Sequence, residues 1–305
     1  MTDQPAALAP IVLMSFNRAD YLEQVLESLM RQQGCDIANR AIYLFQDGAR
    51  NAFSGGMHAK QEAIDATVAV FTRMVPNGTT MISPDNLGVA LNFDRAERFV
   101  FEALDLPAAI FLEDDMILSD QYIATLDRLI HDYRDDARVG YLAAYGDHKL
   151  TLEEQQANPS RLDVLHHLWG FATFQRQWRL IRPYVAQYLV HVTDVDYRKR
   201  DHEAIRALFA SWGFGCPASS QDSAKTMACV LTNSIKVNTR IVLGRYIGER
   251  GLHMSAATFE ERGYSRTQMF TDAVPAFEPI NDAVVKRISW EMGHWAGRPR
   301  PVVVQ

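Results

Sequence analysis

The first half of the chain alternates short apolar runs with longer amphipathic stretches, and this alternation restricts the fold more than any other feature. Apolar runs bounded by turn residues predict strands, whereas apolar residues repeating every three or four positions predict helices. Strands are predicted at residues 10–15, 41–45, 79–83, 108–112 and 139–144. Amphipathic stretches separate them, beginning with the one from Tyr21 to Met30. Strand–helix units in this order indicate a largely parallel sheet with right-handed crossovers.

The second half of the chain has a different pattern. From about residue 145 the alternation ends, and we expect helices with one or two short strands that complete the sheet. The sequence contains no low-complexity linker and no internal repeat that would divide the chain. It therefore predicts a single α/β domain over residues 1–305, Rossmann-like, with a mainly parallel central sheet and helices on both faces.

Composition excludes several classes of protein. The chain has 31 lysine and arginine residues and 37 acidic residues, which gives a net charge of −6. It contains no block of basic residues, so nucleic acid is not expected as the main partner. The three widely spaced cysteines favour neither a disulfide framework nor a cysteine zinc site. The N-terminal residues do not resemble a signal peptide, and no apolar run reaches the roughly 18 to 20 residues of a transmembrane helix. We expect a cytoplasmic protein, with peripheral membrane association left open.

Unusual polar residues follow the predicted strands, where each strand ends. In open α/β sheets, ligands bind at the carboxyl ends of the strands. The pattern therefore predicts that these residues line one ligand site. The set comprises Asn17, Arg18, Asp47, Asn86, Glu113, Asp114 and Asp115.

The acidic triplet 113–115 directly follows an apolar strand pattern. Adjacent carboxylates repel one another unless a cation or hydrogen-bond donors compensate. Hard divalent ions prefer such oxygen ligands and also bridge phosphates. The position favours a metal role, and the alternative is an acidic turn at the surface.

Several segments, taken in order, resemble a known family. Residues 11–18, 45–48, 86–88 and 111–116 resemble the donor-binding half of GT-A glycosyltransferases, most closely the inverting N-acetylglucosaminyltransferase I type and related bacterial family 2-like enzymes. In the second half, Trp169-Gly-Phe-Ala-Thr-Phe174 resembles the WGWATW segment of those bacterial enzymes, with phenylalanine at its second and third aromatic positions. Residues 221–223 and 246–255 resemble their later aspartate and glycine–histidine elements.

The resemblance implies a metal site and a nucleotide-sugar site. Asp115 is implied as a metal ligand and His253 as a second one, which would favour Mn²⁺ over Mg²⁺. For His253 the alternative is a loop histidine without a ligand. Asp47 is implied to bind the base, with uracil as the expected one, and its alternative is turn formation in Asp-Gly. The implied nucleotide-sugar residues also include Ser15, Asn17, Arg18, Asn86, Glu113, Asp114, Trp169 and Gly170.

Asp222 is the candidate catalytic base. An inverting transferase needs one carboxylate to take the proton from the acceptor hydroxyl as it attacks the anomeric carbon. Ser219, Ser220 and Asp222 also fit the start of a helix, where aspartate is favoured as a cap or first-turn residue. The two roles are compatible.

The resemblance implies a metal-dependent inverting glycosyltransferase that moves a sugar from a nucleotide sugar, with UDP preferred, to a glycan, lipid-linked or protein acceptor. Residues 1–145 would form the donor half and residues 146–305 the acceptor half. One alternative is a sugar-1-phosphate nucleotidyltransferase, although the turn 15–19 lacks the glycines which that class needs. Another is a non-catalytic nucleotide- or glycan-binding module. P-loop, dinucleotide-binding, HExxH and GxSxG motifs are absent.

Overall fold

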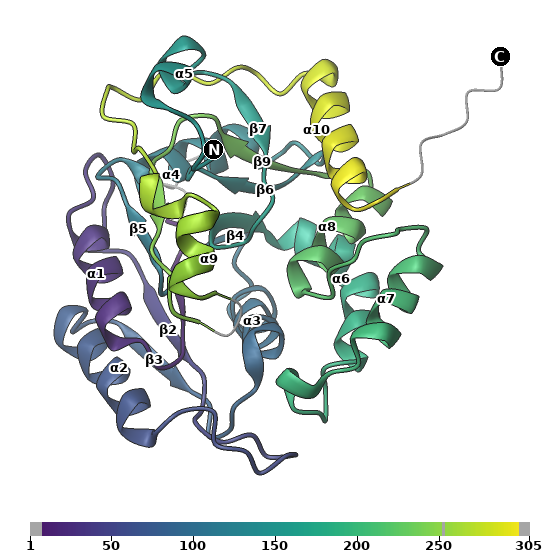
Figure 1. Cartoon of the computed structure of the whole chain (residues 1–305). Coiled ribbons are helices and arrows are strands. Elements are labelled where there is room, and N and C mark those ends of the chain that lie inside the picture. Colours follow the sequence, from purple (N-terminus) through teal and green to yellow (C-terminus); the bar gives the residue numbers. More distant parts are fainter. Residues whose placement is uncertain (1–7, 252–253, 299–305) are drawn as a thin grey trace.

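The computed structural model describes residues 8–251 and 254–298. Its centre is an eight-stranded sheet flanked by helices (Figure 1). The strands lie in the order β3–β2–β1–β4–β8–β6–β9–β7. Their bounds are β1 Ile11–Ser15, β2 Ile42–Gln46, β3 Thr79–Ile82, β4 Ala108–Glu113, β6 Val139–Ala143, β7 Leu162–Val164, β8 Gly170–Phe174 and β9 Ile235–Thr239.

The sheet is mainly parallel. Strands β3, β2, β1 and β4 pair parallel in that order, and β6 pairs parallel with β9. Strand β8 is antiparallel to both β4 and β6, so β6 and β9 run in the same direction as the first four strands. Only β8 and the edge strand β7 run the other way. The predicted α/β fold with a mainly parallel central sheet is confirmed.

The helices pack in groups against the sheet. Helix α1 contacts α2, whereas α6 contacts α3 and α8, and α10 contacts α8 and β9. A π-helical turn at Phe99–Ala103 continues α3. The helical bounds are α1 Ala19–Met30, α2 Gln61–Met74, α3 Gly88–Arg98, α4 Tyr122–Tyr133, α5 Leu152–Ala157, α6 Gln175–Val190, α7 His202–Ser211, α8 Gln221–Leu231, α9 Ala256–Glu261 and α10 Asp282–Trp295.

The second half supplies more strands than the sequence pattern predicted. The expectation of one or two short strands was wrong, because β7, β8 and β9 all join the main sheet. Strand β9 reads Ile-Lys-Val-Asn-Thr, yet all five residues are buried. Its polar side chains find partners in distant segments, such as Asn238 Nδ2 donating to the carbonyl of Gly146 at 3.1 Å. Local apolar patterning therefore could not reveal it. The division into donor and acceptor halves at about residue 145 stays a prediction.

A second, two-stranded sheet lies directly after the acidic triplet. Strand β5 (Met116–Leu118) pairs antiparallel with β10 (Gly244–Tyr246), with Met116 opposite Tyr246. This pairing brings the segment after β10 to the triplet, although the two are far apart in the chain. The backbone N–H of Ile247 donates to the carbonyl of Asp115 at 2.8 Å.

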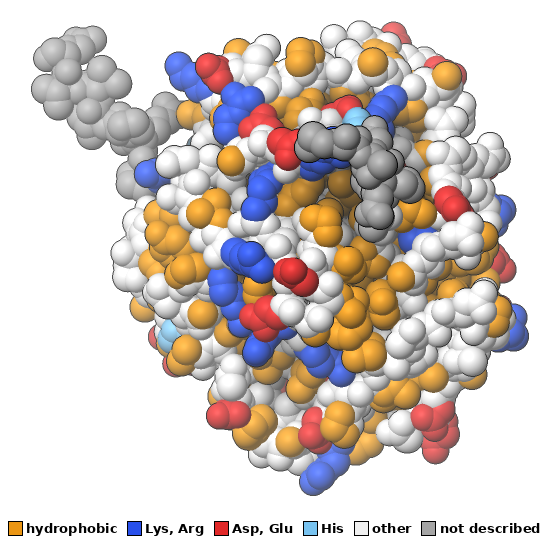
Figure 2. All heavy atoms as spheres, turned by 180° about the vertical axis from the view of Figure 1, so that it is seen from behind, with side chains coloured by type: hydrophobic (Ala, Val, Ile, Leu, Met, Phe, Trp, Pro, Cys, Tyr) orange, Lys and Arg blue, Asp and Glu red, His pale blue; other side chains and the backbone are white. Residues whose placement is uncertain are grey.

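The surface carries both signs of charge. On the face in Figure 2, lysine and arginine side chains lie interspersed with aspartate and glutamate. Ion pairs at the surface include Arg98 with Glu102, at 2.9 Å between Nε and Oε2. Within residues 8–251 and 254–298, no helix has both the length and the apolar character needed to cross a membrane.

Candidate functional site

The ends of β1 and β4 form the centre of the candidate site. Because the two strands are neighbours in the sheet, with Met14 opposite Glu113, the residues that follow them lie side by side. Ser15 Oγ donates to Asp114 Oδ2 at 3.4 Å. Arg18 forms ion pairs with both Asp114 and Asp115, and its Nη1 lies 2.7 Å from Asp115 Oδ2. Three predicted site residues, Ser15, Asn17 and Arg18, lie at the end of β1. Of these, Ser15 and Arg18 contact the acidic triplet.

Burial makes this acidic cluster electrostatically unusual. Asp114 and Asp115 are each 2% exposed. Burial raises the pKa of Asp115 to about 6, against the opposing charge of Arg18. Burial and the charges of Asp115 and Asp222 raise the pKa of Glu113 well above its usual range. One oxygen of the cluster, Asp115 Oδ1, is buried without a hydrogen-bond partner among the described residues.

The segment after β10 covers the cluster. The Arg18 guanidinium also donates from Nη1 to the carbonyl of Arg250 at 3.3 Å. Gly248 lies so close that a Cβ there would collide with the carboxylate of Asp115 and the phenol of Tyr246. The sequence identified residues 246–255 only by resemblance, and the structure places their first part against Asp115. His253, the predicted second metal ligand, lies outside the described residues.

Asp47 and Asn86 are turned into the protein. Asp47 Oδ1 accepts the N–H groups of Leu87 (2.7 Å) and Gly48 (3.0 Å), and Oδ2 accepts from Gly88 N–H (3.0 Å) and Asn86 Nδ2 (3.1 Å). Four donors match the roughly four lone-pair sites of a carboxylate. Burial raises the pKa of Asp47 to about 6, although these donors oppose the shift. Only the Gly48 N–H contact is local to the Asp-Gly turn, and the other three donors belong to residues 86–88. Base binding by Asp47 stays a prediction.

Asp222 lies at the start of α8. Ser220 caps the helix by accepting the Ser223 N–H at 3.2 Å, so the predicted helix start is confirmed. Asp222 Oδ2 accepts the N–H of Leu168 at 3.1 Å. The N–H of Glu113, at the end of β4, donates to the carbonyl of Trp169 at 2.7 Å, so the segment Leu168–Trp169 joins the start of α8 to the end of β4. The helix role of Asp222 is thus visible, while its role as a base stays a prediction.

Trp169 and Gly170 are engaged by packing. The indole of Trp169 stacks on His167 and on Tyr246, with ring centroids 4.5 and 4.4 Å away and planes 11° and 14° apart. These contacts use the ring surface that a stacked sugar would need. A Cβ on Gly170 would lie 2.9 Å from the hydroxyl of Tyr122, so any larger residue would require the buried Tyr122 ring to shift. Contact of either residue with a nucleotide sugar stays a prediction.

Asn17 and Trp178 differ in their surroundings. Asn17 follows β1 and is partly buried. Trp178, four residues after β8, is buried and lies against Phe101 at a centroid distance of 5.8 Å.

Sequence reasoning missed a buried lysine beside Asp222. Lys236 is fully buried, and its Nζ donates to Thr226 Oγ1 at 2.7 Å and to the His166 carbonyl at 3.3 Å. Burial lowers its pKa to about 8, while the charge of Asp222 opposes this shift. No local pattern marked Lys236, because it lies within a short strand that the sequence did not reveal.

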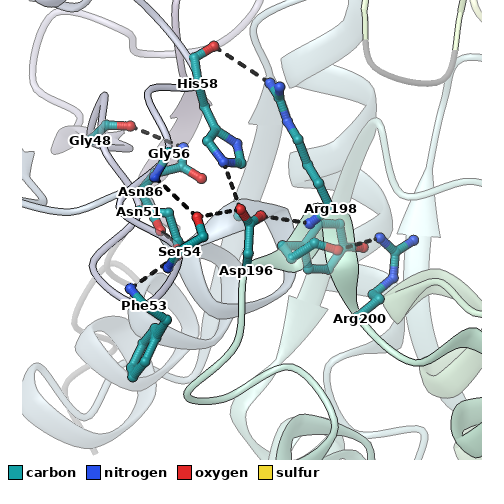
Figure 3. A network of polar contacts seen from close by, with 12 residues as sticks. Gly48, Asn51, Phe53, Ser54, Gly56, His58, Asn86, Asp196, Arg198 and Arg200 are labelled. Carbon is teal, nitrogen blue, oxygen red and sulfur yellow. Dashed lines mark hydrogen bonds and ion pairs between the residues drawn. The ribbon is translucent and has the colours of Figure 1, made fainter.

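A polar network that the sequence also missed joins two distant loops (Figure 3). Asp196 Oδ2 accepts from Ser54 Oγ at 2.6 Å and lies 3.0 Å from His58 Nε2. Its neighbour Tyr197 packs against Gly88 at the start of α3. The loop after β2 is therefore held against the segment between α6 and α7. Only tertiary contacts identify this pairing.

One carboxylate oxygen of the acidic cluster is available to a ligand. Within residues 8–251 and 254–298, no three histidine, cysteine or acidic side chains group as a complete metal site. Asp115 Oδ1 is the one buried carboxylate oxygen there without a partner. A divalent ion can bind to one or two carboxylates together with substrate phosphates, so a single protein oxygen suits an ion that arrives with its nucleotide.

The sequence matches no protein-family model and no curated protein. Among solved structures, the chain is similar to TarS of S. aureus, with a TM-score of 0.43 and 9% identity, over 76% of this chain and 36% of TarS. It is also similar to the mannosyltransferase PcManGT from Pyrobaculum calidifontis, with a TM-score of 0.40 and 12% identity, over 76% of both chains. These likenesses are weak, so the residues of this chain must carry the functional argument.

Proposed function

We propose that the chain is a metal-dependent, inverting glycosyltransferase of the GT-A type, which uses a nucleoside-diphosphate sugar, with UDP as the preferred nucleotide. The observation that carries the proposal is the buried Asp115 Oδ1, which has no partner among the described residues, at the carboxyl end of β4. Arg18 stands beside it, and Asp222 acts on the same cluster from α8. This edge of the sheet is where α/β proteins bind nucleotides.

Asp115 would hold the divalent ion, Mn²⁺ or Mg²⁺, through Oδ1. When bound, the ion would neutralise the diphosphate leaving group as a Lewis acid. Arg18 already compensates the other oxygen of Asp115, so the cluster is partly neutralised before substrate binds. Its guanidinium can also donate to phosphate oxygens, for which its planar geometry is suited.

Asp222 would act as the general base. Its Oδ2 accepts a backbone N–H, and this contact fixes the orientation of the carboxylate beside the site. In the proposed reaction, the acceptor oxygen forms a bond to the anomeric carbon while the bond to the diphosphate breaks. The acceptor proton moves to Asp222, and attack from the face opposite the diphosphate inverts the anomeric centre.

Calorimetry with UDP, GDP and UTP, each with and without Mn²⁺, tests the proposal. We expect Mn²⁺-dependent binding of UDP, and its loss in Asp115→Asn, which keeps the shape of the side chain but removes the charge. Asp65→Asn on the exposed face of α2 is the matched control and should bind like the wild type. Equal UDP affinity in Asp115→Asn and wild type would remove Asp115 from the metal site. Absence of nucleotide binding in the wild type would overturn the transferase, and a strong preference for UTP would favour the nucleotidyltransferase.

A further inference from the structure

Arg200 is a buried cation without an acidic partner. Its side chain belongs to a residue that is only 7% exposed, and among the described residues no carboxylate forms an ion pair with it. Its Nη1 donates to the carbonyl of Tyr197 at 2.7 Å, and its guanidinium carbon lies 4.0 Å from the centre of the Tyr197 ring. Its Nε is buried and unpartnered. In Figure 3 a dashed line joins the guanidinium to the Tyr197 carbonyl, and none joins it to the carboxylate of Asp196.

Such an arrangement is costly for a free protein. Removing a charge from water is compensated only when an opposite charge and hydrogen bonds replace the lost hydration. Arg40 shows the usual solution in this chain, because it is also buried and forms a bidentate pair with Asp127. Arg200 has a carbonyl and an aromatic ring instead, neither of which carries a full negative charge.

A second unpartnered donor lies in the same part of the fold. Gln221, the first residue of α8, is 5% exposed, and its Nε2 has no partner among the described residues. Contacts to Ser219 connect the two positions, since the Tyr188 hydroxyl donates to its carbonyl at 3.5 Å. His202, two residues after Arg200, has its Nδ1 2.6 Å from Ser219 Oγ. Two buried side chains with unused N–H groups therefore stand near the start of α8.

The position of Arg200 and Gln221 relative to the proposed base, Asp222, indicates which substrate these donors would bind. Gln221 directly precedes Asp222, the proposed base, and Arg200 lies on the segment that packs against the residues just before α8. Arg200 and Gln221 thus lie beside the proposed base and on the second-half segment, whereas Arg18 is the cation of the donor side. The base must meet the acceptor hydroxyl, so a group bound beside it belongs to the acceptor.

We propose that Arg200 and Gln221 form a subsite for an anionic group, a phosphate or a carboxylate, carried by the acceptor next to the hydroxyl that receives the sugar. This inference rests on the proposed function for its assignment to the acceptor. The guanidinium suits such groups, because it presents several N–H donors in one plane and keeps its charge at any physiological pH. The negative charge of the ligand would also balance the buried cation.

Binding of inorganic phosphate and glycerol phosphate to the full chain tests the proposal, with glycerol as the neutral control. We expect the wild type to bind both phosphates at millimolar concentration and Arg200→Gln to bind them at least about tenfold more weakly, as for loss of a charge-assisted contact. Arg200→Lys, which keeps the charge, should lose less, and Gln221→Ala should weaken binding by a smaller factor. Binding of UDP with Mn²⁺ should change less than about twofold in Arg200→Gln.

Arg40→Gln is the matched control, because it removes a buried arginine that already has an acidic partner. It should lower the unfolding midpoint without changing the phosphate affinity. Arg200→Gln should instead weaken phosphate binding without lowering the unfolding midpoint. Unchanged phosphate affinity in Arg200→Gln, or no phosphate binding by the wild type, would overturn the subsite. A loss of UDP affinity with phosphate affinity intact would also overturn it, since Arg200 would then serve the donor. If the wild type binds phosphate but no nucleotide, and Arg200→Gln loses the phosphate binding, the anion subsite is retained and the transferase is rejected.

Discussion

At the scale of single residues, two buried aspartates near the same edge of the sheet show how surroundings separate structure from chemistry. Both have a pKa raised to about 6 by burial. Asp47 has four donors from its own loop and the start of α3, and these contacts use its hydrogen-bonding capacity. Asp115 has one oxygen bound by Arg18 and one without a partner among the described residues. Only Asp115 therefore has an oxygen ready for a ligand.

Asp222→Asn tests the proposed base. The amide keeps the size of the side chain and can still accept the Leu168 N–H, but it cannot take a proton at neutral pH. We expect UDP binding close to that of the wild type and a fall in kcat of about 10²- to 10⁴-fold, measured as sugar transfer or donor hydrolysis with Mn²⁺. Asp201→Asn is the control, since Asp201 also stands at a helix start, where it caps α7. Full activity in Asp222→Asn would leave Asp222 as a helix residue only.

At the scale of elements, α8 is tied to α3 by a buried ion pair. Lys225 on α8 pairs with Glu97 on α3, and the two side chains are 3% and 2% exposed. The same ammonium lies 5.1 Å from the centre of the Phe93 ring. Because α8 also carries Asp222 and Gln221, this pair helps to set the position of the proposed base and anion subsite relative to the sheet.

Removing one partner of this pair should be much worse than removing both. Lys225→Met leaves Glu97 as a buried charge without a partner, so we expect a loss of about 3–5 kcal/mol in the free energy of unfolding. The double variant Glu97→Leu/Lys225→Met should recover most of that loss. Urea unfolding measures both, with Arg98→Ala as the control, since Arg98 and Glu102 form an exposed pair whose loss should cost less than about 1 kcal/mol. A similar, small cost for Lys225→Met and Arg98→Ala would contradict the importance of burial here.

At the scale of the whole molecule, the second half of the chain buries polar residues inside a strand of the main sheet. Lys236, Asn238 and Thr239 are buried in β9, where contacts with α8 and neighbouring loops satisfy their side chains. A buried lysine links stability to pH. The pKa of Lys236 falls from 10.5 to about 8 on folding, so the unfolded chain binds more protons between these values. Its contribution to stability therefore rises with pH across that window.

Lys236→Met should remove this pH dependence. We expect the stability of the wild type relative to the variant to increase between pH 8 and 10.5 by up to about 3 kcal/mol, because each pKa unit corresponds to about 1.4 kcal/mol. Urea unfolding at intervals of pH measures the difference. Lys286→Met on the exposed face of α10 should run parallel to the wild type. Parallel curves for Lys236→Met and wild type would show that Lys236 titrates in the folded protein as it does in water.

The local pattern of the sequence determined the first five strands of the main sheet and the helices between them, because hydrophobic periodicity is a property of neighbouring residues. It also predicted that the polar residues after these strands would share one edge, since parallel strands share their carboxyl ends. Contacts join Ser15 and Arg18 to the acidic triplet, whereas a single site that includes Asp47 and Asn86 stays a prediction. The helix start at Ser220 followed from local capping preferences in the same way. These features needed no knowledge of distant contacts.

Tertiary structure alone decided how those residues are used. Arg18 pairs with Asp114 across 96 positions and contacts Arg250 across 232, and no local pattern specifies such pairings. Distant contacts also turned Asp47 inward and placed the ring of Tyr246 against Trp169. The packed fold left Arg200 buried without an acidic partner among the described residues. The physical reason is that burial and charge depend on every element packed around a side chain. Sequence patterning shows where a polar residue lies along its own element, and only the packed fold shows which of its atoms remain free for a ligand.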